Sequence, residues 1–120
     1  MDNVIFSYTA QEAMEDGYLF DVSNIAKEAG FNYPVRITAG VKDLVTPSEE
    51  SAQLGQSYEG RLWDVLTIAR IAIKNSKDDY FTSFEVIFQD GPKNKKKQKM
   101  YAALDGTSGP AIHIILPSEY

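Results

Sequence analysis

The sequence predicts an α+β fold: a C-terminal three-stranded antiparallel meander packed on one long helix, with short N-terminal helices and an extended segment. Three observations favour this class. Apolar residues recur at helical spacing over residues 58–75, they alternate with polar residues in three later runs, and turn-forming residues separate those runs. A helix followed by strands that are joined by tight turns is typical of an α+β domain.

The first predicted elements are a brief helix and a short extended segment. Thr9 and Glu12 have the spacing of a capping box, in which each side chain binds an amide left free at the start of a helix. Asp16 and Gly17 then form a turn signal that ends this helix. Residues 18–22 are apolar enough for a short strand.

A second short helix is predicted over residues 24–29. Ser23 is the expected N-cap, and Gly30 fits the stop at the C-terminal end. Three weaker predictions follow along the chain: a strand over residues 35–39, a helical turn over residues 41–45, and a polar loop or frayed helix over residues 48–56.

The long helix is predicted over residues 58–75 because its apolar side chains follow the i, i+3, i+4 pattern of one helix face. This face comprises Leu62, Val65, Leu66, Ala69, Ala72 and Ile73. Asp64, Thr67, Arg70 and Lys74 line the opposite side. The helix is therefore expected to be the central one and to lie against the sheet.

Three other residues stand in the first turns of this helix. Arg61 and Asp64 are three positions apart, so they can pair on the surface, which stabilises a helix by only a few tenths of a kcal/mol (about 0.2–0.5). Trp63 lies between them in the chain, and we expect it to be buried as an anchor for the N-terminal segment, near Tyr8 and Phe20.

Three strands are predicted after the helix, over residues 81–89, 99–104 and 111–116, because side chains alternate between the two faces of a sheet. The turn over residues 105–110 contains glycine and proline and separates the last two strands. The residues predicted to form the core between helix and sheet are Leu62, Leu66, Phe84, Val86, Ile112 and Ile114.

The other face of the predicted meander is also rich in apolar and aromatic side chains. It carries Phe81, Ile87, Tyr101, His113 and Ile115. That is a large apolar group for a face in contact with water. Two explanations are open: the N-terminal elements cover this face, or part of it binds another chain.

A lysine run lies between the first two predicted strands. It consists of Lys93, Lys95, Lys96, Lys97 and Lys99, five of the 12 basic residues of the chain. We expect it at a hairpin tip, where it is either a solvated turn or a basic contact for phosphates or an acidic protein. No aromatic residue is interleaved with these lysines in the sequence, which disfavours stacking of single-stranded bases.

Length and composition predict a single soluble domain over residues 1–120. The chain has 120 residues, no cysteine and a net charge of −5, and it has no apolar run long enough to cross a membrane. Residues 1–64 hold 11 acidic and 4 basic residues, a sum of −7, whereas residues 65–120 hold 6 and 8, a sum of +2. The N-terminus lacks a secretory signal, so we expect a cytoplasmic protein that holds DNA weakly or not at all by itself.

The residues for enzyme chemistry are sparse, and we expect no enzyme, no cofactor and no metal site. No glycine-rich phosphate loop is present, and the single histidine, His113, is expected to be a half-buried structural residue; a general base and a pH switch are its alternatives. Asp16 and Asp21 flank a short segment and could support acid–base chemistry. We expect instead a turn at Asp16 and a favourable charge before a helix at Asp21.

Two stretches resemble a family of small uncharacterised proteins encoded by bacterial phages, plasmids and integrative elements. They are FSYTAQEAMEDGYLFDVSNIAKEAGFNYPVRIT and EGRLWDVLTIARIA, and together they span roughly residues 6–73. The shared features are Tyr8-Thr9, Asp16-Gly17, Leu19, Asp21-Val22, Ala26, Ala29-Gly30, Pro34-Val35 and Gly60-Arg61-Leu62-Trp63-Asp64. The resemblance implies a mobile-element protein in a bacterial cytoplasm, and it implies no chemistry for any single residue.

The expected function follows from this context and from the acidic charge. We expect a non-enzymatic protein, monomeric or dimeric, that binds a host protein or a nucleoprotein complex and inhibits host defence, for example a CRISPR nuclease. The alternative is an accessory or regulatory protein of the element that contacts nucleic acid through the lysine run. The predicted primary contact residues are Glu12, Asp16, Glu49 and Glu50, and the predicted secondary contact residues are Lys93, Lys95, Lys96, Lys97 and Lys99.

Overall fold

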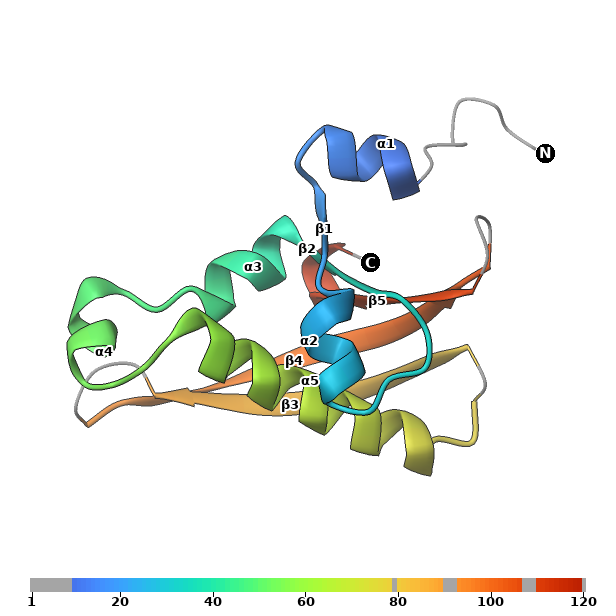
Figure 1. Ribbon diagram of the computed structural model, residues 1–120. Helices are drawn as coiled ribbons and strands as arrows, with labels where there is room; N and C mark the ends of the chain where they lie inside the picture. Colours follow the sequence, from blue (N-terminus) through green and yellow to red (C-terminus); the bar gives the residue numbers. More distant parts are fainter. Residues whose placement is uncertain (1–9, 79, 90–92, 107–109, 120) are drawn as a thin grey trace.

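A computed structural model describes residues 10–78, 80–89, 93–106 and 110–119 (Figure 1). The elements are, in chain order, α1 (Ala10–Glu15), β1 (Leu19–Asp21), α2 (Ser23–Glu28), β2 (Val35–Thr38), α3 (Ala39–Val45), α4 (Glu49–Gln53), α5 (Tyr58–Asn75), β3 (Phe81–Gln89), β4 (Lys95–Asp105), β5 (Ala111–Ile115) and the 3₁₀ helix η2 (Pro117–Glu119).

The predicted α+β class is confirmed, and the sheet is larger than the sequence indicated. Strands β3, β4 and β5 form the expected antiparallel meander. Strand β2 pairs in parallel with β5, with Val35 opposite Ile112, and β1 pairs antiparallel with β2. The result is one five-stranded mixed sheet in the order β1-β2-β5-β4-β3.

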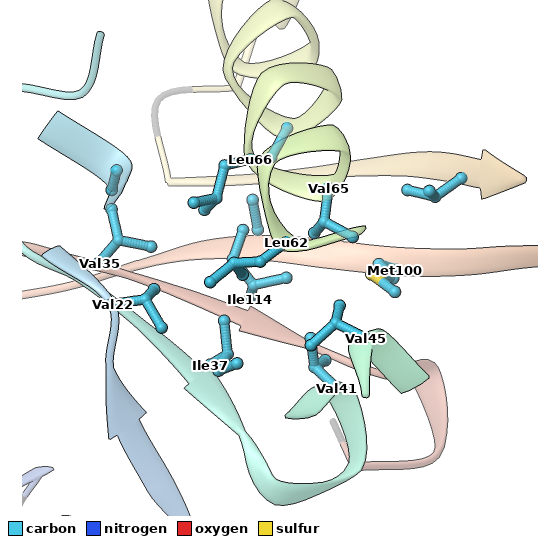
Figure 2. Close-up of a cluster of buried hydrophobic side chains, with 14 of the residues drawn as sticks. Val22, Val35, Ile37, Val41, Val45, Leu62, Val65, Leu66, Met100 and Ile114 are labelled. Carbon is cyan, nitrogen blue, oxygen red and sulfur yellow. The ribbon is translucent and has the colours of Figure 1, made fainter. Parts of the chain in front are cut away.

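Helices α2, α3 and α5 pack on one face of this sheet and enclose the core (Figure 1). The labelled side chains of α5, Leu62, Val65 and Leu66, point toward the sheet and belong to the same buried cluster as Ile114 of the central strand (Figure 2). All six predicted core residues are buried, which confirms them: Leu62, Leu66, Phe84, Val86, Ile112 and Ile114. The opposite side of the sheet is called the outer face below.

Hydroxyl side chains begin three of the helices. Thr38 Oγ1 accepts a hydrogen bond from the Val41 amide at the start of α3. Strand β2 therefore ends at Thr38, one residue before the predicted end at Ala39. Ser48 and Ser57 cap α4 and α5 in the same way. Each hydroxyl satisfies an amide that the helix leaves free, which fixes these starts locally.

The predicted capping role of Ser23 is wrong. Ser23 is the first helical residue of α2, and its hydroxyl accepts a hydrogen bond of 3.1 Å from the Val35 amide of β2. The Asp21 carboxylate accepts from the Ser23 amide at 2.8 Å instead. The bond to β2 joins the helix to the sheet, so the serine serves a long-range contact. Thr9, predicted as the cap of α1, lies outside the described residues.

Helix α1 covers one part of the outer face. Its Ala13 packs on Leu19 of β1, and both side chains are buried. Gly17 follows the helix with φ of +81°, a conformation that favours glycine and that fits the predicted turn. At the opposite margin of the sheet, on the same outer face, Ile87 of β3 remains 59% exposed. The N-terminal elements in the described residues therefore cover the β1 end of the outer face and leave the β3 end open.

Candidate functional site

Three consecutive helices carry five exposed carboxylates between residues 43 and 64. Helix α3 contributes Asp43, α4 contributes Glu49 and Glu50, and the first turns of α5 contribute Glu59 and Asp64. A shallow pocket beside these helices is lined by Asp43, the α4 cap Ser48, Arg61 of α5 and Lys96 of β4. We call the five carboxylates, Asp43, Glu49, Glu50, Glu59 and Asp64, the acidic end.

Arg61 holds the acidic end together from beneath. Its guanidinium donates to the Leu44 carbonyl at 3.0 Å, to the Gln89 carbonyl at 2.6 Å and to Gln56 Oε1 at 3.3 Å. The residue is only 8% exposed, and its guanidinium carbon lies 5.5 Å from the centre of the Phe88 ring. One side chain therefore ties together α3, the loop before α5, and the end of β3.

The predicted surface pair of Arg61 with Asp64 is consequently wrong. The five donors of a guanidinium fork can reach several carbonyl groups at once, whereas a single exposed carboxylate would use only part of them. Arg61 is turned inward, as its exposure of only 8% shows.

Trp63 is turned outward, and the prediction that it is a buried anchor is also wrong. It is 42% exposed and stands about 100° around the helix from Leu62, which occupies the core position. Phe20 packs on the core without it, beneath the Lys42 ammonium group at 4.0 Å from the ring centre. Tyr8 lies outside the described residues. Trp63 therefore presents an indole ring to solvent one helical turn from Glu59.

The structure separates the four acids that the sequence analysis grouped. Glu49 and Glu50 belong to the acidic end, but Glu12 lies on α1 and Asp16 directly follows it. Figure 1 shows α1 and α4 at well-separated places in the molecule. The reason is topological, because α1 leads directly into the edge strand β1, whereas α4 lies between α3 and α5.

The predicted hairpin-tip position of the lysine run is wrong for most of its members. Strand β4 begins at Lys95, and its pairing with β3 extends as far as Gln89. The backbone ladder thus continues through the lysines, and only Lys93 precedes the strand. Because side chains alternate, Lys96 shares the face of the buried Met100 and lines the pocket beside Arg61. The lysines left on the outer face are Lys95, Lys97 and Lys99.

Aromatic residues accompany these outer-face lysines, although none is interleaved with them in the sequence. Lys99 Nζ lies 5.6 Å from the centre of the Tyr101 ring, and the rings of Tyr101 and Phe81 are 4.8 Å apart. The exposed Ile87 is the cross-strand neighbour of Lys97. The chain thus carries its acidic end on the helical side and a lysine row on the outer face.

His113 forms a titratable cluster with Arg36 and Asp105 on the outer face. Arg36 Nη1 donates to His113 Nε2 at 3.2 Å, and Asp105 Oδ2 lies 3.6 Å from the same nitrogen. Burial lowers the pKa of His113; the Asp105 carboxylate opposes this shift, and the Arg36 guanidinium adds to it. The imidazole is therefore neutral in the folded state near neutral pH, and Nε2 is an acceptor.

We expect His113 to make the protein less stable as the pH falls below about 6.5, the ordinary pKa of histidine. Because the folded-state pKa is the lower one, the unfolded chain binds the proton first, and protonation favours unfolding until the folded-state pKa is reached. Thermal melts between about pH 7.5 and about pH 5.5 should show a smaller loss for His113→Gln than for the original protein. Equal slopes for both proteins would contradict this assignment.

Two predicted carboxylate candidates have structural roles. Asp21 accepts from the Ser23 amide, and Asp16 lies in the turn after α1. Among the described residues, no group of three or more histidine, aspartate or glutamate side chains is placed to hold a metal ion. No helix of that same part of the chain is long and apolar enough to cross a membrane.

The chain is an α+β protein that carries five exposed carboxylates on α3, α4 and α5 and three lysines on the outer face of its sheet. The chain has no significant match among protein-family models, curated proteins or solved structures. The resemblance to mobile-element proteins therefore stays a prediction.

Proposed function

We propose that the protein is a non-enzymatic binding protein of a bacterial mobile element, and that its acidic end contacts a basic surface of a host protein in the cytoplasm. The observation that carries this proposal is Trp63, which is 42% exposed in the first turns of α5, where Glu59 and Asp64 are also exposed. Partly exposed tryptophan residues are frequent energetic centres of protein interfaces. Leu54, 51% exposed at the end of α4, adds a second apolar contact.

The charge of the acidic end indicates the kind of partner. Five carboxylates on one end attract a positively charged cleft and repel nucleic acid, so they can occupy a place that phosphates normally take. In the mobile-element context implied by the resemblance, an inhibitor of host defence such as a CRISPR nuclease, acting on the nuclease or its nucleoprotein complex, is the function that fits this chemistry.

Arg61 supports the same proposal, because it makes the acidic end rigid before binding. Its three hydrogen bonds fix α3 and α5 relative to the end of β3. A surface that is already ordered loses less conformational entropy when it binds.

The test compares two variants of equal net charge. Glu49→Lys/Glu50→Lys alters the acidic end, and Glu12→Lys/Asp16→Lys makes the same charge change near α1. Tagged proteins would capture partners from nuclease-treated bacterial lysate, and each captured protein would be purified and titrated. We expect the first variant and Trp63→Ala to lose binding, and the second variant to retain it. If both charge variants bind equally well, the acidic end is not the contact.

A second candidate function rests on the outer face, where Tyr101 and Phe81 lie beside Lys99. An accessory or regulatory protein of the element could contact single-stranded nucleic acid there, since lysines track phosphates and rings stack with bases. We expect only weak binding, because the chain has a net charge of −5 and this face offers three lysines.

A gel-shift titration of the purified protein decides between the two candidates. It would use single-stranded and duplex DNA, with Lys95→Ala/Lys97→Ala/Lys99→Ala as the test variant and Lys27→Ala/Lys74→Ala/Lys77→Ala as the control. Tight binding at physiological salt that only the test variant loses would make the nucleic-acid function the leading one.

A further inference from the structure

Strand β3 is a long edge strand, and Glu85 is its one charged residue. It forms one margin of the sheet and is nine residues long, whereas β1 at the other margin has three residues. Natural edge strands are commonly blocked by shortness, by lysine or by proline. The sequence of β3, FTSFEVIFQ, contains neither lysine nor proline. Within the described residues, no strand pairs with its outer margin.

We propose that β3 pairs antiparallel with β3 of a second copy of this chain, with Phe84 opposite Phe84 of the second copy. The two five-stranded sheets would then form one continuous sheet, with α5 of each copy on the same side. A symmetric dimer of this kind uses the same strand in both partners, so the strand must be complementary to itself.

The side chains of β3 select this register. Opposite residues must lie on the same face of the sheet, so residues of equal parity must meet across the interface. With Phe84 at the centre, Glu85 faces Ser83 of the second copy, and Ile87 faces Phe81. The 59% exposed Ile87 thereby gains an aromatic neighbour, which is a favourable cross-strand pair.

The two neighbouring registers are worse. A register centred on Glu85 places the two Glu85 carboxylates directly opposite each other, and like charges in this position destabilise a sheet. A register centred on Ser83 places the Glu85 carboxylate opposite the aromatic ring of Phe81. In the proposed register the two Glu85 residues are only diagonal neighbours, and each has Lys99 of its own β4 beside it.

A second copy explains the chemistry of β3 better than an unrelated peptide does. The outer-face positions of β3 follow the order apolar, polar, polar, apolar (Phe81, Ser83, Glu85, Ile87), and this order matches itself when it is reversed about Phe84. A shallow surface hollow lined by Ser83, Phe84, Glu85 and Lys99 marks the centre of the same register. This interface uses the outer margin of β3 and does not depend on the function proposed above.

Cysteine crosslinking tests the register, and the chain offers a clean background because it contains no cysteine. In Ser83→Cys/Glu85→Cys, each introduced thiol faces the other thiol of the second copy. Residues directly opposite in an antiparallel pair are about 4.5–5.5 Å apart between Cα atoms, which is within disulfide range. We expect mild oxidation to give a disulfide-linked dimer on a non-reducing gel.

Three controls make the experiment decisive. Lys97→Cys/Lys99→Cys places the same pair of thiols on the outer face of β4. Glu85→Cys alone reports the rejected register that is centred on Glu85. Both variants should crosslink far less than Ser83→Cys/Glu85→Cys. Sedimentation of the original protein should show a monomer–dimer equilibrium that Ile87→Lys shifts to higher concentration. A purely monomeric original protein, or equal crosslinking from Lys97→Cys/Lys99→Cys, would overturn the proposal, and preferential crosslinking of Glu85→Cys would overturn the register.

Discussion

Replacing Arg61 by methionine should lower the free energy of unfolding by about 3 kcal/mol or more. Hydrogen bonds from a charged donor contribute about 1.5–3 kcal/mol each, and a buried acceptor left without a donor adds its own cost. Methionine fills similar space but leaves the carbonyl groups of Leu44 and Gln89 without the donors that Arg61 supplies. Urea denaturation followed by circular dichroism measures the change.

Arg70 provides the matched control on the same helix. Its guanidinium makes one exposed hydrogen bond, to the Gly30 carbonyl at 3.3 Å. Arg70→Met should therefore cost less than about 1 kcal/mol. Arg61→Lys should fall between the two variants, because a single ammonium group cannot reach the same acceptors in the same geometry. If Arg61→Met proved as stable as Arg70→Met, the three hydrogen bonds of Arg61 would not have the stabilising role assigned to them here.

The other large effect is expected at Leu66. Leu66→Ala should destabilise the protein by about 2–5 kcal/mol, because the side chain is fully buried between α5 and the sheet and its removal leaves a cavity (Figure 2). Leu54→Ala removes the same atoms from a position that is 51% exposed, so its cost should be much smaller. Thermal and urea unfolding of the two variants side by side test this, and similar losses would contradict the core assignment.

The local parts of the fold could be predicted from the sequence. Helix α5 spans Tyr58–Asn75 and β3 spans Phe81–Gln89, as expected, because long periodic segments carry a strong signal. The parallel pairing of β2 with β5 could not be predicted, since it joins Arg36 to His113 across 77 positions and leaves no local pattern. That the lysines belong to strand β4 could not be predicted for a related reason, because pairing with β3 overrides their weak strand propensity.

The candidate site was less predictable than the fold. Glu49 and Glu50 could be selected from charge alone, but only the arrangement of α3, α4 and α5 joins them to Asp43, Glu59 and Asp64. Arg61 and Trp63 were assigned to the wrong environments because both flank a core position on the helix. A side chain in such a place turns inward or outward according to the partners that tertiary structure provides.

The position of β5 has a consequence for how the chain folds. This strand lies between β2 and β4, yet it comes after both of them in the chain. Until β5 is inserted, the β1–β2 pair and the β3–β4 hairpin are separate pieces with open margins. Closing the long loop between β2 and β5 costs entropy before any contact compensates for it, so insertion of β5 is the step that should limit the folding rate. Until then, the unpaired backbone groups at the margins of β2 and β4 stay open to pairing with other chains.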